Sequence, residues 1–164
     1  MSKQEQPDQD QTATEDAPKA IYLADYQPPG YTTQQTGLHF DIRDGQTTVT
    51  ATLQVARQDA AASQMELLGE ELTLVSVELD GRALSSNEYA LSDHSLTLFN
   101  LDEGHEIRIV TQICPEENTA LEGLYRSSSM YCTQCEAEGF RKITYYQDRP
   151  DVLSKFKTTI VADA

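Results

Sequence analysis

An alternation of apolar and polar residues with a period of two restricts the fold of this chain more than any other sequence feature. Apolar side chains occupy every second position in residues 38–42 and again in residues 49–55, and Asp44-Gly45 lies between the two runs. Successive side chains of a β-strand point to opposite faces, and Asp-Gly is a frequent tight turn between paired strands. The sequence therefore predicts a β-hairpin in this region.

Further short runs of β-type residues follow the hairpin. Residues 72–79 alternate except for one slip at Val75, which predicts a β-bulge or a change of face, and Asp80-Gly81 supplies the next turn. Three more short strands are expected, around residues 89–91, 96–98 and 107–109. Short strands separated by Asn, Asp, Gly and Ser, with few helical periods between them, are typical of antiparallel, sandwich-type sheets. The predicted fold class is therefore mostly β.

The character of the chain changes after Pro115. Residues 118–139 are rich in Glu, Ser, Gly and Cys and follow neither period, so we expect a long irregular segment, which in a compact domain is usually functional or mobile. Residues 148–156 contain Pro150 at a place suited to the first turn of a helix, which predicts one short helix there. Residues 157–162 are typical of a strand, and since the sequence stops soon afterwards, we expect it to end inside a larger fold.

Residues 1–19 contrast with everything that follows them. They consist mainly of Gln, Asp, Glu, Thr and Pro, and such a segment cannot bury enough apolar surface to offset the entropy lost on ordering. A length of 164 residues is the size of about one domain. We therefore expect a disordered acidic tail at 1–19 and one β domain at 20–164 that is incomplete at its C-terminal end.

The formal net charge of −15 excludes several kinds of partner. Binding to nucleic acid depends largely on Lys and Arg that release counterions from phosphates, and an anionic membrane surface would repel the chain. No apolar stretch approaches the roughly 20 residues needed to cross a bilayer, so we expect no membrane insertion. The first residues show neither the basic nor the apolar region of a secretory signal, which makes the cytoplasm the expected location.

Cys114, Cys132 and Cys135 are an odd number of cysteines, which favours free thiols in a reducing compartment. The spacing of the last two would also suit a metal or redox site, but a structural zinc site normally needs four ligands. We place His39 on a strand, and His94 and His105 at turns. None of the three forms an HExxH pattern, so the residues predict no metal site.

No motif for catalysis is present either. The sequence contains no Ser-His-Asp arrangement with motif support and no phosphate-binding loop of the GxxxxGKS type. Glu136 and Glu138, beside Gln134, lie in the irregular segment, where side chains can project into a cleft. Two such glutamates are most often solvated surface residues, and local chemistry alone gives them no role.

Three strings change that interpretation. They are NTALEGLY at 118–125, CTQCEAEGFR at 132–141 and ITYYQDRPDV at 143–152. Together they closely resemble the end of the N-terminal domain in the bacterial branch of the aminopeptidase N family, the gluzincin zinc aminopeptidases. The resemblance is dense over residues 118–163 and extends more weakly back to Tyr26.

The resemblance implies a saddle-shaped, mostly β domain that packs against a thermolysin-like catalytic domain and forms one wall of its active site. It also implies that Glu136 binds the free α-ammonium of a peptide substrate, and that Gln134 lines the pocket for the first side chain. Both residues match the family pattern. We expect Glu138 to be structural and to satisfy backbone donors near Gly139.

The family's HExxH zinc motif, its third zinc-binding glutamate, its GAMEN-type loop and its catalytic tyrosine have no counterpart in this sequence. The resemblance therefore implies zinc in a parent enzyme, no zinc and no catalytic residue in these 164 residues, and no activity of this chain alone. A free-standing β-sandwich binding module without catalysis is the main alternative. A small metal or redox protein that uses Cys132 and Cys135 is a third hypothesis.

Overall fold

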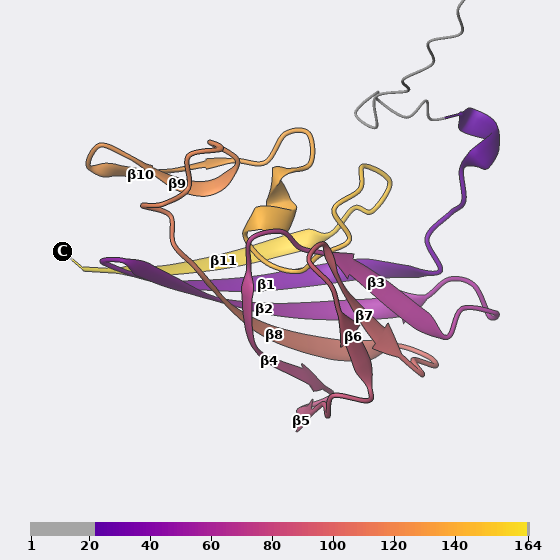
Figure 1. Cartoon of the computed structure of the whole chain (residues 1–164). Helices are drawn as coiled ribbons and strands as arrows, with labels where there is room; N and C mark the ends of the chain where they lie inside the picture. The colour runs from indigo at the N-terminus through magenta and orange to yellow at the C-terminus, as the bar shows by residue number, and fades with distance from the viewer. Residues whose placement is uncertain (1–21, 164) are drawn as a thin grey trace, which may run out of the picture.

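The computed structural model describes residues 22–163 and contains three β-sheets (Figure 1). The largest sheet has six strands in the order β11-β1-β2-β8-β4-β5. Its strands are β1 (Tyr31–Arg43), β2 (Gln46–Arg57), β4 (Thr73–Leu79), β5 (Arg82–Ala83), β8 (His105–Ile113) and β11 (Lys155–Ala162). The predicted tail at 1–19 lies outside the described residues.

Two smaller sheets accompany the large one. The three-stranded sheet has the order β3-β7-β6, formed by β3 (Gln64–Leu68), β7 (Ser95–Phe99) and β6 (Tyr89–Leu91). The two-stranded sheet is a hairpin of β9 (Gly123–Ser127) and β10 (Met130–Gln134). Two short 3-10 helices, η1 (Leu23–Asp25) and η2 (Gly139–Lys142), complete the described part of the chain. The mostly β, sandwich-like class predicted from the sequence is confirmed.

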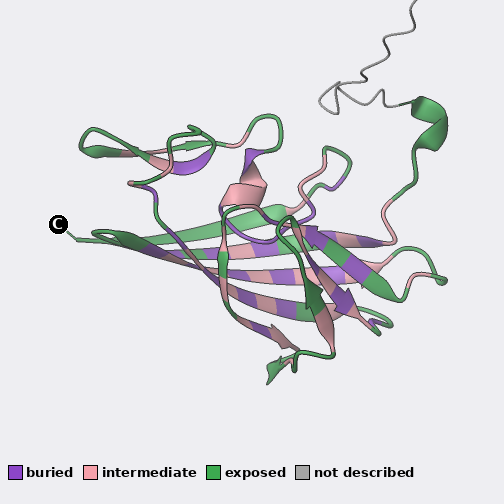
Figure 2. Ribbon diagram, viewed as in Figure 1, coloured by how far each residue is buried: buried purple, intermediate pink, exposed green. Residues whose placement is uncertain are grey.

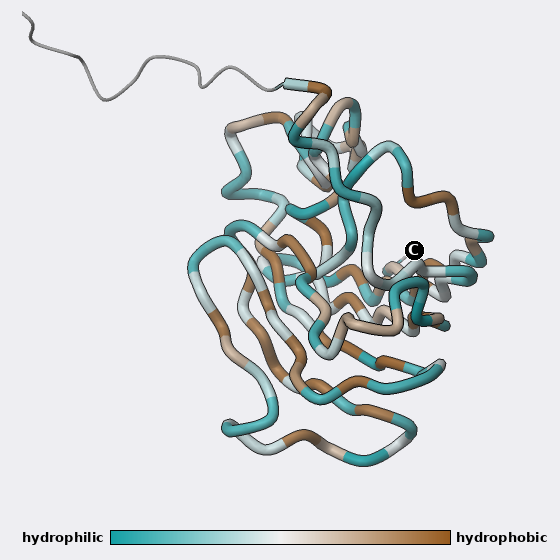
Figure 3. The backbone as a smooth tube through the Cα atoms, turned by 90° about the vertical axis from the view of Figure 1, so that its right-hand side faces the viewer, coloured by the Kyte–Doolittle hydropathy of each residue, from teal (hydrophilic) through white to brown (hydrophobic). Residues whose placement is uncertain are grey.

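The core lies between the six-stranded and the three-stranded sheets, which together we call the body. Val49, Leu53 and Ile109 of the large sheet and Leu67 and Leu98 of the small sheet are all fully buried. Figure 2 shows the burial alternating along the strands, and Figure 3 shows hydrophobic and hydrophilic residues alternating in the same way. Removing this apolar surface from water is the main force that closes the two sheets on each other.

Several local predictions are confirmed. The hairpin β1–β2 turns at residues 44–45, and β4–β5 turns at Asp80-Gly81, where both residues have positive φ. The register between β4 and β8 shifts between Leu74 and Ser76, which is the bulge that the slip at Val75 predicted. The strand expected at 157–162 is β11.

The short helix predicted at 148–156 is wrong. The chain makes a turn around Pro150, and β11 begins at Lys155 and pairs in parallel with β1 along eight residues, from Gln35 to Ile42. A helix of about two turns is marginal in water, whereas pairing along β1 satisfies a whole row of backbone groups. The parallel pair also departs from the purely antiparallel sheet that the sequence predicted.

Several other elements were missed. Residues 118–139 are not irregular throughout, because they contain the β9–β10 hairpin. Most of this hairpin is exposed, so no burial on one face imposed a period of two on its sequence. Strand β3 was also overlooked, although Met65 and Leu67 alternate with polar neighbours and carried the signal.

Candidate functional site

The candidate site is the loop that joins β10 to η2, residues 134–138, which we call the site loop. Gln134 is the last residue of β10 and pairs with Gly123 at the start of β9. Gln134 and Glu136 are both exposed, and the Gln134 Nε2 donates a hydrogen bond of 3.3 Å to the backbone oxygen of Glu136. The peptide bond between Glu136 and Ala137 is cis. The two residues singled out from the sequence therefore lie side by side on the surface.

Two glycines allow the backbone to close around the site loop. A Cβ atom added to Gly139 would lie 2.6 Å from the backbone oxygen of Gln134, and one added to Gly123 would lie 2.8 Å from the Cβ of Lys142. Gly123 also has a φ of +70°, which a residue with a side chain rarely adopts. The start of β9, the end of β10 and η2 thus meet at backbone contact, which fixes both ends of the site loop.

The hairpin is also tied to the body by polar side chains. Tyr131 donates a hydrogen bond of 2.5 Å to Glu116, and the Arg126 guanidinium lies 3.5 Å from the same carboxylate and over the Tyr131 ring. The hydrogen bond to Glu116 raises the pKa of the Tyr131 hydroxyl, because the charged acceptor favours its protonated form. These polar contacts add to apolar packing, because Leu124 of β9 lies in the core and Tyr131 of β10 packs against it.

Glu138 does not satisfy backbone donors near Gly139, as the sequence had suggested. Its carboxylate instead lies 2.9 Å from the guanidinium of Arg141, and its side chain makes no capping hydrogen bond to η2. The structural role predicted for Glu138 therefore has a different partner. Sequence reasoning could not identify it, because Arg141 faces Glu138 only once η2 has formed.

The cysteines do not gather into a site. Cys135 packs against the core, and this burial raises the pKa of its thiol. A thiol held in its protonated form is a poor nucleophile and a poor metal ligand. Cys114, Cys132 and Cys135 are all free, and residues 22–163 contain no group of three or more His, Cys, Asp and Glu that could hold a metal ion.

The histidines are equally separate from the site loop. His39 lies on β1, His94 lies in the turn between β6 and β7, and His105 begins β8. The His105 ring bonds to Asp80 at 2.7 Å and to Asp102 at 2.9 Å. This arrangement joins two surface turns of the body.

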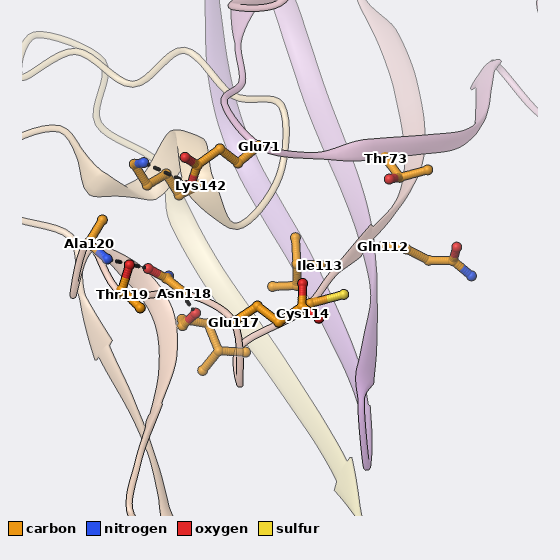
Figure 4. Close-up of a pocket in the computed structure, with 11 residues that line it drawn as sticks. Glu71, Thr73, Gln112, Ile113, Cys114, Glu117, Asn118, Thr119, Ala120 and Lys142 are labelled. Carbon is orange, nitrogen blue, oxygen red and sulfur yellow. Dashed lines mark hydrogen bonds and ion pairs between the residues drawn. The ribbon is translucent and has the colours of Figure 1, made fainter.

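A cavity of about 320 Å³ lies between the end of β8, the segment after it and η2 (Figure 4). At one side Lys142 pairs with Glu71 at 3.1 Å, and at another the Asn118 carbonyl accepts a hydrogen bond from the backbone of Ala120. Sequence reasoning did not find this cavity. Neither Gln134 nor Glu136 lines it, so it is distinct from the site loop.

The part of the chain that the structure describes has no helix both long and apolar enough to cross a membrane.

The same fold is found in solved structures of metallopeptidases. Legionella pneumophila aminopeptidase A, in complex with aspartic acid, superposes with a TM-score of 0.79 at 33% identity, covering 84% of this chain and 17% of that one. The M1 zinc metallopeptidase of Deinococcus radiodurans superposes with a TM-score of 0.70 at 17% identity, covering 82% of this chain and 33% of that one. The fold is thus that of a β domain found in M1 peptidases.

The sequence comparisons identify the family. The chain matches the family model of the Peptidase M1 N-terminal domain over residues 27–164, and it belongs to that family. It is 44% identical over 148 residues to aminopeptidase N of Caulobacter vibrioides and 45% identical over 146 residues to aminopeptidase N of Escherichia coli. These alignments cover 90% and 89% of this chain but only 17% of each relative, so the chain spans about a sixth of their length.

Proposed function

We propose that this chain is the substrate-recognition domain of a zinc aminopeptidase that removes N-terminal amino acids from peptides. In this proposal Glu136 binds the α-ammonium group of the substrate, and Gln134 lines the pocket for the first side chain. The observation that carries it is the site loop itself, where an exposed carboxylate is held on a backbone fixed at both ends. Glu138 is paired with Arg141, whereas no ion pair within residues 22–163 involves Glu136.

The chemistry of an aminopeptidase requires such a group. A peptide α-amino group has a pKa near 8 and is largely cationic at neutral pH, so a fixed carboxylate forms a charge-assisted hydrogen bond with it. A blocked N-terminus would leave that carboxylate desolvated and unpaired in a closed cleft. Selectivity for free N-termini would therefore come from a penalty as well as from an attraction.

Residues 22–163 do not fit a zinc site. Residues 22–163 hold no cluster of His, Cys, Asp and Glu suited to a metal ion, and the cysteine of the CxxC pair that packs against the core is held protonated by burial. Zinc in the parent enzyme would have to be held by residues outside these 164. We accordingly propose that the chain alone is inactive and that its partner is a catalytic domain.

The exposed strand β11 supports a partner domain. Every described residue of β11 is exposed, including Phe156 and Ile160 with 53% and 65% of their surface accessible. The strand is also an edge of the large sheet, with one row of backbone groups not paired within that sheet. Apolar side chains and an edge strand left uncovered are typical of surfaces that pack against another protein part.

We also propose a cytoplasmic location, no binding of nucleic acid and no insertion into a membrane. The three free thiols suit a reducing compartment. The net charge of −15 opposes binding to phosphate backbones.

A chimeric enzyme tests the role of Glu136. Residues 27–164 replace the matching segment of C. vibrioides aminopeptidase N, and kcat/KM is measured on aminoacyl substrates. Glu136→Ala should lower kcat/KM by a factor on the order of 10² or more, because a charge-assisted contact to the substrate is lost. Glu66→Gln, at an exposed glutamate on β3, is the matched control and should leave the rate unchanged. An active chimera that is indifferent to Glu136→Ala would exclude the assigned role.

The alternative function, a free-standing β-sandwich binding module, predicts a different behaviour of the isolated chain. Such a module should be monomeric and should unfold cooperatively, whereas a recognition domain that exposes β11 should self-associate. Sedimentation velocity of the full chain distinguishes the two. Replacing Phe156 and Ile160 with Ser should abolish association if the exposed strand causes it.

A further inference from the structure

We propose that Arg141 is a positioning residue, which holds the site loop in place by joining Glu138 to the largely buried carboxylate of Asp148. The inference rests on the proposed function, because it concerns how Glu136 is presented to substrate. The contribution of Arg141 is to connect the loop to the body through its guanidinium group.

Arg141 donates three hydrogen bonds to Asp148. Its backbone N–H and its Nε donate to the Asp148 Oδ2 at 3.1 and 3.0 Å, and its Nη2 donates to the Asp148 backbone oxygen at 3.1 Å. The two side chains are only 15% and 10% exposed. A partly buried, charge-assisted pair with several bonds has a single geometry, unlike a solvated surface pair.

The same guanidinium also contacts the site loop. Its Nη2 also lies 2.9 Å from the Glu138 Oε2, at the last residue of the loop. Burial, followed by the charge of Asp148, raises the pKa of the Cys135 thiol in the site loop. The ion-pair network Asp148–Arg141–Glu138 therefore runs from the largely buried Asp148 side chain to the exposed side chain of Glu138, the last residue of the loop that carries Gln134 and Glu136.

The segment behind Arg141 is fixed to the three-stranded sheet. The backbone oxygen of Arg141 accepts a hydrogen bond from the Glu70 N–H, and Leu68 and Tyr146 exchange two backbone hydrogen bonds of 2.7 and 3.0 Å. Leu68 ends β3, which lies in the body. Backbone hydrogen bonds thus connect the body to Arg141, whose ion pair with Glu138 reaches the site loop.

The position of Glu136 matters because, in the proposed function, its carboxylate must lie within hydrogen-bonding distance of the substrate α-ammonium group. A displacement of about 1 Å in a binding group can cost up to 10²-fold in rate. Lysine could not replace Arg141, because a single ammonium group lacks the rigid fork that bonds Asp148 and Glu138 together. The proposed role therefore requires the geometry of arginine at position 141, and a positive charge alone is not enough.

Hydrogen–deuterium exchange of the full chain tests the positioning role without any catalysis. Arg141→Lys should accelerate amide exchange in the peptide that covers residues 132–139 by about tenfold or more, and leave β1 and β2 unchanged. Arg108→Gln removes a comparable ion pair, to Glu78 on the large sheet, and should not affect the site loop. Unchanged exchange in the site loop would overturn the proposal.

A double-mutant cycle in the chimeric enzyme tests the consequence for substrate. Arg141→Lys should lower kcat/KM by about tenfold to a hundredfold, mainly through KM. Added to Glu136→Ala, it should have little further effect, because the group that it positions is absent. A purely structural role would reduce activity by the same factor in both backgrounds, and that result would also overturn the proposal.

The two experiments keep the proposals separable. If Glu136→Ala has no effect while Arg141→Lys loosens the loop, the proposed function fails and the mechanical role of Arg141 stands. If Glu136→Ala is damaging while Arg141→Lys changes neither exchange nor kcat/KM, only the inference about Arg141 fails. Should Arg141→Lys unfold the chain, Asp148→Asn provides the second variant, because it weakens the same pair and keeps its shape.

Discussion

The body and the β9–β10 hairpin of this molecule are held together by different interactions. In the body, side chains such as Leu53, Leu98 and Ile109 are completely buried between two sheets. In the hairpin and the site loop, most residues are exposed. Leu124 and Cys135 pack in or against the core, and close glycine contacts and ion pairs around Glu116 and Arg141 add to that packing. A segment that buries few apolar residues gains little from the hydrophobic effect, so polar and steric contacts contribute a larger share of its order.

The largest loss of stability is expected from a substitution in the core of the body, and a substitution in the hairpin should have little effect. Leu53→Ala removes a fully buried side chain and should lower the free energy of unfolding by about 2–5 kcal/mol. Met130→Ala, at a hairpin residue that is 63% exposed, should change it by no more than about 0.5 kcal/mol. Urea denaturation of the full chain measures both. Similar losses from the two variants would show that the hairpin is part of the same apolar core.

A smaller loss of stability should measure how far close packing at Gly123 holds the site loop in place. Gly123 and Gly81 both have positive φ, at +70° and +78°, but only Gly123 is crowded. Gly81→Ala should therefore cost about 1–2 kcal/mol for the backbone conformation alone, and Gly123→Ala should cost at least about 1 kcal/mol more, since Lys142 must move. Equal costs would mean that η2 gives way without resistance.

The smallest effect concerns charge on the body. Hydrogen bonds from His105 and from the Glu106 N–H lower the pKa of Asp80 below its ordinary value. The ionised Asp80 carboxylate therefore stabilises the folded state fully when the pH is above the ordinary aspartate pKa. This stabilisation is lost as the pH falls through the lower pKa that Asp80 has in the folded state.

Asp80→Asn measures that contribution. The substitution should reduce the free energy of unfolding by about 1 kcal/mol or less at neutral pH, since Asp80 is a surface group. The difference from the unaltered protein should disappear in strong acid, where both are uncharged at this position. A constant difference across this range would show that the carboxylate charge is not what stabilises the turn.

Much of the body was predictable from the sequence. The β1–β2 hairpin, the bulge near Val75, and β6, β7, β8 and β11 followed from alternation and from turn residues, because each of these strands except β11 has a face against the core. The helix predicted at 148–156 failed, since its residues allowed either structure and only pairing with β1 decided between them. The roles of Glu136 and Gln134 came from the resemblance to a family and stay predictions.

By itself, the sequence determined that this chain is a mostly β domain, because period-two burial and short turn motifs are local properties that residues carry wherever they lie. Only the tertiary structure decided that Arg141 faces Asp148 and Glu138, and that Gly123 and Gly139 meet at backbone contact. Those contacts join segments whose proximity cannot be predicted from any local sequence pattern. They exist only because η2 is packed against the ends of β9 and β10.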